Sequence, residues 1–135
     1  DDFEHDFIDC IEWNEKTEIA SIQNFDIGVM PLRDFNSFEK GKCGYKLIQY
    51  MACSVPVIAS PVGINVDIVQ KSDSGLLADD VITWQNSLIQ LLDSPEDRLK
   101  YGLAGRKAVE NLYSSKIQAP IMKSILCNAL NFFRS

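Results

Sequence analysis

Residues 26–75 read DIGVMPLRDFNSFEKGKCGYKLIQYMACSVPVIASPVGINVDIVQKSDSG, and this stretch decides the fold. Short apolar runs at residues 26–31, 56–60 and 75–78 are bounded by proline, glycine or polar residues, which predicts buried parallel strands. Apolar residues recur at helical spacing in residues 45–53, and residues 66–70 predict a second, shorter helix. Strands that alternate with helices are typical of a parallel α/β sheet.

The flanking segments extend this pattern. Before the central helix we expect a strand at residues 7–13, a helix at 15–24 and a polar loop at 33–44. Ser94, followed by Pro95 and two acidic residues, predicts a helix N-terminus. Pro120 cannot donate a backbone hydrogen bond, so we expect the last helix to start or kink there. The C-terminal helices are predicted at residues 83–92, 95–112 and 115–133.

The composition is that of one globular domain, with 135 residues, 46 % of them hydrophobic, and a formal net charge of −6. A general nucleic-acid binder would carry clustered lysine and arginine, so the charge argues against that class and, weakly, against a polybasic membrane surface. The four cysteines form no C-x-x-C pair, and no histidines are placed to complete a zinc site. We therefore expect reduced thiols and no bound metal.

The ends of the chain carry no targeting signal. The sequence opens Asp1-Asp2-Phe3-Glu4, without a basic region before an apolar run, and no apolar stretch reaches transmembrane length. The missing initiator methionine predicts that the sequence begins inside a longer protein. These features favour a cytoplasmic domain.

A glycine-containing loop precedes the helix predicted at residues 45–53. Such a loop exposes backbone N–H groups at the positive end of the helix dipole, which suits a phosphate. Lys42 and Lys46 would add charge-assisted contacts, and Gln49 would hydrogen-bond a sugar or ribose. The loop forms neither a GxGxxG set nor a Walker motif, so a plain surface loop with solvated lysines remains the alternative interpretation.

Several motifs occur together in the chain. A strand that matches D-I-x-v-x-P is followed by a loop and by a helix whose last residues resemble A-M-A. After this helix come a strand that resembles P-V-V-A, a glycine turn and a strand that matches G-l-l. Residues that match these motifs are 26–31, 50–59, 61–63 and 75–77, followed by a g-R-x-x-v-e match at 105–110 and Y-S at 113–114. This combination resembles the retaining, group-1 glycosyltransferases of the GT-B class, over nearly the whole chain.

The resemblance implies the C-terminal, nucleotide-sugar-binding half of a GT-B fold. Its architecture would be a Rossmann-like, three-layer α/β domain, with helices on both faces of a parallel sheet and a helical C-terminal tail. Residues 1–135 would then be a single, truncated domain whose substrate is a nucleotide-diphosphate sugar, without a cofactor or metal. A glycan or lipid-linked acceptor would bind through the missing N-terminal domain, and the full-length protein would lie in the cytoplasm or at the inner membrane face.

The sequence departs from the family pattern at two acidic positions. Gly41 and Gln49 occupy the places of the two glutamates, in a variant that reads K-C-G-x-K-x-x-Q-Y-M-A. By resemblance, Gln49 would hold the ribose, but it carries no charge for acid–base chemistry. Catalytic residues would lie largely outside this chain, which alone would transfer little sugar. The predicted donor-binding residues are Gly41, Lys42, Gly44, Lys46, Gln49, Val62 and Gly63.

Two other functions remain open from the sequence. The lost acids would also suit a non-catalytic nucleotide-sugar-binding or regulatory module on the same fold, and an unrelated flavodoxin-like module ranks last. For the remaining residues we expect packing or solvation: Trp13 and Trp84 as core or interface residues, and Glu18 on a solvated face. An exposed pair at residues 132–133 would mark a lost interdomain contact or drive self-association of the fragment.

Overall fold

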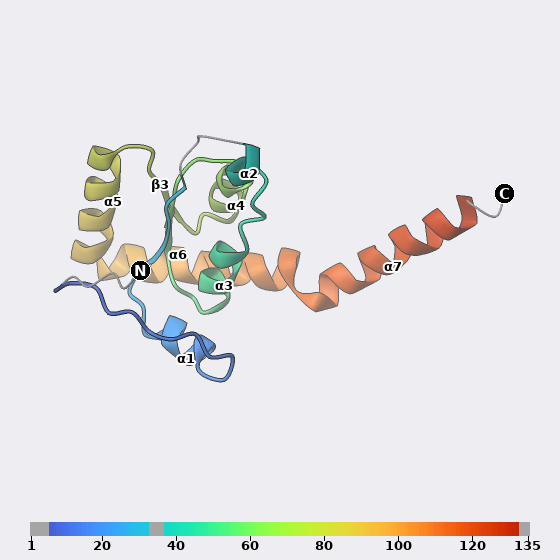
Figure 1. The fold of residues 1–135 in the computed structure, drawn as a ribbon, viewed down its shortest axis with the longest axis horizontal. Helices are drawn as coiled ribbons and strands as arrows, with labels where there is room; N and C mark the ends of the chain where they lie inside the picture. The colour runs from blue at the N-terminus through green and yellow to red at the C-terminus, as the bar shows by residue number, and fades with distance from the viewer. Residues whose placement is uncertain (1–5, 33–36, 133–135) are drawn as a thin grey trace.

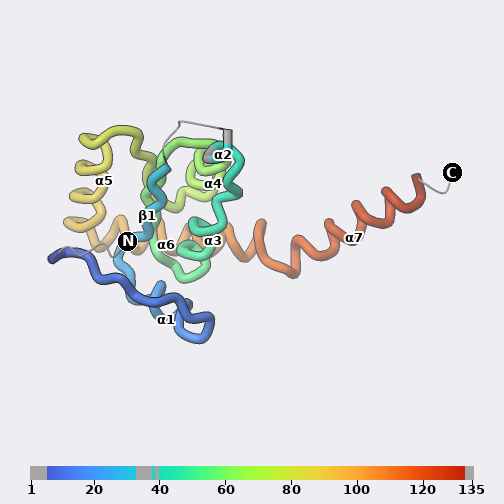
Figure 2. Tube along the Cα trace, viewed as in Figure 1, coloured from blue at the N-terminus to red at the C-terminus, as the bar shows by residue number. Residues whose placement is uncertain are grey.

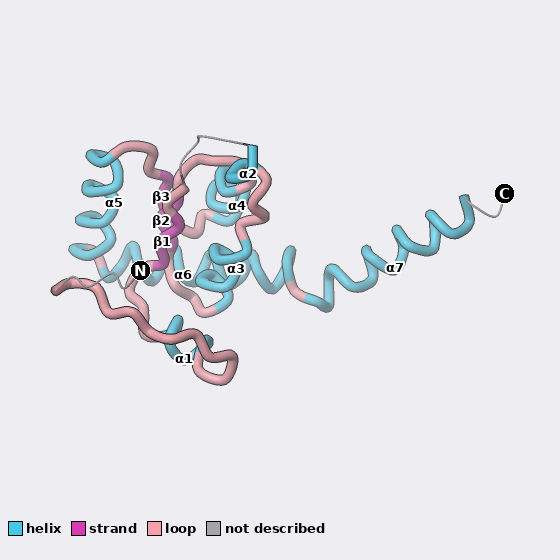
Figure 3. The backbone as a smooth tube through the Cα atoms, in the orientation of Figure 1, coloured by secondary structure: helices cyan, strands magenta, loops and turns pink. Residues whose placement is uncertain are grey.

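A computed structural model describes residues 6–32 and 37–132. Its centre is a three-stranded parallel sheet in the order β1-β2-β3. The strands are β1 (Gly28–Met30), β2 (Val57–Ala59) and β3 (Gly75–Leu77), each inside an apolar run that predicted a strand. The parallel pairing confirms that interpretation of the runs, and the chain crosses over through a helix between successive strands (Figure 3).

Helices make up most of the remaining structure, and they lie on both faces of the sheet (Figure 1). The predicted α/β class, with a three-layer Rossmann-like arrangement and a helical C-terminal tail, is therefore confirmed. In chain order the helices are α1 (Glu18–Gln23), α2 (Ser37–Lys40), α3 (Tyr45–Ala52), α4 (Asn65–Ser72), α5 (Val81–Asp93), α6 (Pro95–Ala108), the π-helical η1 (Val109–Tyr113) and α7 (Ser115–Phe132).

Successive side chains of β2 point to opposite faces of the sheet, and the core is therefore divided into two clusters. Val57 and Ala59 face α3 and α4, where they pack with the fully buried Leu47 and Met51 of α3. Ile58 points to the opposite face and packs against Leu91 of α5. Because all three β2 residues are fully buried, this short strand anchors both layers and holds the ends of the sheet in a fixed position.

Side-chain caps set the start of two C-terminal helices. Asp80 accepts a hydrogen bond from the Thr83 N–H, and the Thr83 hydroxyl oxygen in turn accepts one from the Asp80 N–H, which completes a capping box at α5. Ser94 accepts a hydrogen bond from the Asp97 N–H at the start of α6, so the predicted cap is confirmed. The α5 cap was not anticipated, and α5 begins two residues earlier than expected.

The strand predicted at residues 7–13 is wrong. Ile8 forms an isolated bridge, and residues 9–14 have no strand pairing. Phe7 is 90 % exposed and Ile11 72 % exposed, so this apolar segment does not contribute to the core. A strand needs continuous pairing of its backbone groups, and this segment shows only the single bridge at Ile8.

The loop before α3 and the last helix were also predicted from the sequence. Of the loop predicted at residues 33–44, residues 33–36 lie outside the described part of the chain, and α2 forms a single helical turn within the rest. The helix predicted at residues 115–133 is confirmed as α7, which begins at Ser115, and Pro120 lies inside it and is not its start. The tail of α7 contains no buried residue and extends away from the sheet (Figure 2).

Candidate functional site

Helix α3 begins at a glycine in the left-handed backbone conformation, which favours glycine. Gly44 is the N-cap, with φ of +68°, and it is buried. A Cβ atom added there would collide with Ile68 Cδ1 of α4. Because Gly44 has no side chain, the first-turn N–H groups of α3 lack the side-chain cap that Asp80 and Ser94 provide elsewhere. This helix start is therefore free to hold an external acceptor.

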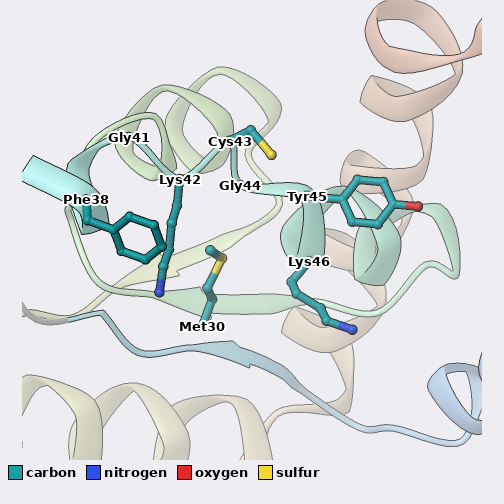
Figure 4. A pocket seen from close by; sticks show the side chains of 8 residues that line it. All are labelled: Met30, Phe38, Gly41, Lys42, Cys43, Gly44, Tyr45 and Lys46. Atoms are coloured by element: carbon teal, nitrogen blue, oxygen red, sulfur yellow. The ribbon is translucent and has the colours of Figure 1, made fainter. Parts of the chain in front are cut away.

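A cavity of about 510 Å³ lies at this helix start (Figure 4). Four of the predicted donor-binding residues line it, together with neighbours from β1 and α2. In the view of Figure 4, the Lys42 side chain lies between Phe38 and Met30, with Lys42 Nζ 5.8 Å from the centre of the Phe38 ring. No carboxylate among the described residues forms an ion pair with Lys42, which leaves its charge available to an anion. The lining residues are Met30, Phe38, Gly41, Lys42, Cys43, Gly44, Tyr45 and Lys46.

Two predicted residues on α3, Lys46 and Gln49, contact α1, although Lys46 also lines the cavity. Lys46 Nζ lies 3.8 Å from Glu18 Oε1 and points away from Lys42 in Figure 4. Gln49 Nε2 donates a hydrogen bond to the same Glu18 oxygen, at 3.1 Å. Gln49 Oε1 is buried and has no hydrogen-bond partner among the described residues, and Gln49 does not line the cavity.

Glu18 is not part of a solvated face, contrary to the sequence-based interpretation. Its side chain is 23 % exposed, because it lies against α3. The Glu18 carboxylate therefore lies beside Gln49, the residue that takes the place of a glutamate in the sequence pattern. Nothing in the linear sequence links Glu18 to residues some thirty positions later, so only the packing of α1 could reveal it.

The remaining two predicted residues support the loop from behind. Val62 is 7 % exposed, and Gly63 has a φ of +56°. A Cβ atom at Gly63 would collide with the carbonyl oxygen of Lys40, so this turn packs directly against the end of α2. Val62 and Gly63 thus lie near the loop that lines the cavity without forming its wall.

A buried polar pair connects the strand ends behind the loop. Ser60 Oγ accepts a hydrogen bond from the Leu32 N–H at 2.9 Å, and Asn65 Nδ2 donates one to the Ser60 carbonyl oxygen at 3.2 Å. Asn65 is fully buried, and within the described part of the chain its Oδ1 has no hydrogen-bond partner. The same Oδ1 would lie 3.5 Å from a Cβ at Gly44, so it faces the start of α3. Sequence reasoning missed Asn65, whose polar side chain resembles a surface residue of a short helix.

The cysteine beside the C-terminus of α3 is not poised as a nucleophile. Burial raises the pKa of the Cys53 thiol, and the charge of Glu18 raises it further, whereas the charge of Arg106 lowers it. The Arg106 guanidinium also donates to the Ala52 carbonyl oxygen and pairs with Glu110. Since the thiolate is the reactive form, Cys53 stays protonated at neutral pH and belongs to the packing of this helix end.

In the part of the chain that the structure describes, no helix combines the length and apolar character needed to cross a membrane.

Comparisons with known proteins agree with this architecture. The family model for group 1 glycosyl transferases matches residues 7–94. A GDP-mannose-dependent monoacylated alpha-(1-6)-phosphatidylinositol monomannoside mannosyltransferase of Corynebacterium glutamicum is 32 % identical over 123 residues. The alignment covers 89 % of this chain and 32 % of that protein, so the chain spans about a third of the relative's length. The family match extends over more than half of the chain, which therefore belongs to the group 1 glycosyl transferases.

Proposed function

We propose that this chain is the donor-binding part of a GT-B glycosyltransferase that uses a nucleotide-diphosphate sugar. The observation that carries the proposal is the uncapped N-terminus of α3, which opens beside Lys42 into the cavity of Figure 4. Backbone N–H groups, the helix dipole and a lysine without an ion-pair partner among the described residues suit a diphosphate. The glycine at position 44 permits the left-handed backbone with which α3 starts, in close contact with Ile68 of α4.

The same groups would assist the reaction. When the bond between the sugar and the diphosphate breaks, negative charge develops on the leaving phosphate oxygens. The α3 N–H groups and Lys42 would stabilise that charge without reorganisation and without a bound metal. Gln49 does not line this cavity and its Oε1 is buried, so contact with a ribose hydroxyl would require the side chain to turn out of its hydrogen bond with Glu18.

The acceptor is a glycan or a lipid-linked molecule in this proposal. The relative from Corynebacterium glutamicum is named for transfer to a phosphatidylinositol mannoside, and this chain covers a third of its length. Residues beyond that third would supply the catalytic groups and most of the acceptor site. We therefore expect the isolated chain to bind a donor nucleotide but to transfer little sugar, in the cytoplasm or at the inner face of a membrane.

Calorimetric titration of the chain with GDP, UDP and ADP tests the donor site. We expect saturable binding of one nucleotide, weakened about 10- to 100-fold by Lys42→Ala, since a hydrogen bond to a charged group contributes about 1.5–3 kcal/mol. Lys71→Ala is the matched control, because Lys71 is 69 % exposed and pairs with Asp67 on α4. Equal affinities for the wild type and Lys42→Ala, or no binding of any nucleotide, would refute the donor site.

A non-catalytic binding module on the same fold is the alternative. Gly41 and Gln49 support it, because neither carries a carboxylate and the nearest acid to Gln49 is held in a hydrogen bond. The two functions differ in donor turnover. A longer form of the protein that binds the nucleotide sugar but never releases its sugar, to water or to an acceptor, would favour the binding module.

A further inference from the structure

A second and larger cavity, of about 840 Å³, opens at the same edge of the sheet on the α5 side. The ends of all three strands contribute to it, followed by the first turns of α5. Ser60 follows β2, Asp79 and Asp80 follow β3, and Trp84 lies on α5. None of the predicted donor-binding residues lines this cavity, so it is not the site at the start of α3.

The rim of this cavity offers hydrogen-bonding groups that are only partly used. Oδ1 of Asp79 and Oδ1 of Asp80 accept hydrogen bonds from Thr83, whereas their Oδ2 atoms have no partner among the described residues. Ser60 Oγ accepts the Leu32 N–H, which leaves its hydroxyl proton to donate. Gln85 adds an exposed amide at the same rim. Hydroxyl groups of a ligand would therefore meet both acceptors and donors.

An aromatic ring forms part of the wall. Trp84 packs against the cluster of Ile58, Ala78 and Leu91, so the orientation of its ring is fixed by the core. Beside it, Pro31 and Leu88 complete an apolar surface. A wall that is apolar on one side and polar on the other matches a pyranose, whose C–H face packs on an aromatic ring while its hydroxyls point outwards.

The charges of the two cavities are opposite. Among the described lining residues, the first cavity has Lys42 and Lys46 and no acidic residue, whereas the second has Asp79 and Asp80 and no lysine or arginine. Carboxylates repel a phosphate, so the second cavity selects against a nucleotide and for an uncharged polyol. The cavities flank the end of β1, since Met30 lines the first and the next residue, Pro31, lines the second.

We propose that the second cavity is a binding subsite for a neutral sugar ring. Its role as a place for an acceptor sugar next to the donor rests on the proposed function, whereas sugar binding itself does not. The stacking wall is Trp84, and the hydroxyl-binding groups are Asp79, Asp80, Ser60 and Gln85. A single ring held by so few contacts would bind with a Kd of the order of 1 mM.

The test follows the indole N–H signal of Trp84 in a Trp13→Phe background, where Trp84 is the single tryptophan. Trp13 is 69 % exposed, so its replacement leaves the core intact. Methyl α-glucoside, galactoside and mannoside are titrated to about 50 mM, well above that Kd, and the indole N–H signal is followed by NMR. We expect a saturable shift with at least one sugar, weakened about tenfold by Asp79→Asn, which removes a charge without changing shape. Asp93→Asn, at the exposed far end of α5, is the matched control and should leave the shift unchanged.

Thermal unfolding of each variant verifies folding, and Gln85→Ala serves as a second variant if Asp79→Asn is unstable. No shift of Trp84 with any of the three sugars, or equal affinity in wild type and both variants, would overturn the subsite. A Trp84 shift that follows protein concentration instead of sugar would also overturn it and would assign the cavity to self-association. Sugar binding without nucleotide binding would retain this subsite and refute the donor site, and the reverse result would do the opposite.

Discussion

Replacing Gly44 by alanine should destabilise the chain by about 1–3 kcal/mol. The left-handed backbone at φ +68° costs an alanine about 1–2 kcal/mol. The new Cβ would also collide with Ile68 Cδ1, and displacing that side chain from its rotamer adds about 0.5–1.5 kcal/mol. Alanine also restricts the unfolded chain more than glycine does, which offsets about 0.4–1 kcal/mol of this destabilisation. The colliding atom is the end of a flexible side chain, so we expect a folded variant with a lower melting temperature.

Thermal and urea unfolding, followed by circular dichroism, measure this loss. For a chain of this size the change corresponds to a decrease in Tm of about 4–10 °C. Gly41→Ala is the matched control, because Gly41 lies three residues earlier in the same loop, is exposed and has no positive φ. If Gly44→Ala and Gly41→Ala unfold at the same temperature as the wild type, the left-handed start of α3 is not required, and the argument for an uncapped helix terminus loses its geometric basis.

Three further predictions concern the core, the α5 cap and the tail. Leu91→Ala, at a fully buried position, should lower the free energy of unfolding by about 2–5 kcal/mol in urea titrations, whereas Leu92→Ala, at a position 58 % exposed, should change it by less than about 1 kcal/mol. Hydrogen bonds from Thr83 hold the pKa of Asp80 below its ordinary 3.8, so its contribution to stability is present above about pH 4 and lost as the pH falls through the lowered pKa. The Tm difference between wild type and Asp80→Asn should therefore be largest at neutral pH and vanish in acid, and a constant difference would contradict the shift. On α7, Ile121, Met122, Ile125 and Leu126 form an exposed apolar surface. Ile125→Glu on this surface should abolish any concentration-dependent association in analytical ultracentrifugation, whereas Lys123→Glu, on the opposite side of the helix, should not.

Local signals in the sequence predicted much of the candidate site. The run from Gly41 to Lys46 lines one cavity as a continuous segment, because a loop and the first turn of the following helix stay together whatever the rest of the fold does. Phe38 gave no such signal, since its place depends on the single turn of α2. Gln49 was predicted as a polar contact, but its hydrogen bond to Glu18 depends on α1 packing beside α3.

An apolar run in the sequence does not by itself predict whether the segment is buried. The runs around Val57 and around Ile11 are similarly apolar, yet one is the fully buried centre of the sheet and the other is exposed. Periodicity reports what a segment can bury, whereas strand formation also needs a partner for every backbone group. Residues 7–13 show only the single bridge at Ile8 and do not form the predicted strand.

The sequence by itself determined the α/β class, the parallel strands within residues 26–31, 56–60 and 75–78, the glycine start of α3 and the serine cap of α6. These features depend on contacts between residues close together in the chain, or on apolar runs that can only be buried. Only the tertiary structure decided the pairing register, the contact between Glu18 and Gln49, and the second cavity between the strand ends and α5. Each of these joins segments far apart in sequence, and their meeting is set by which faces pack together in three dimensions.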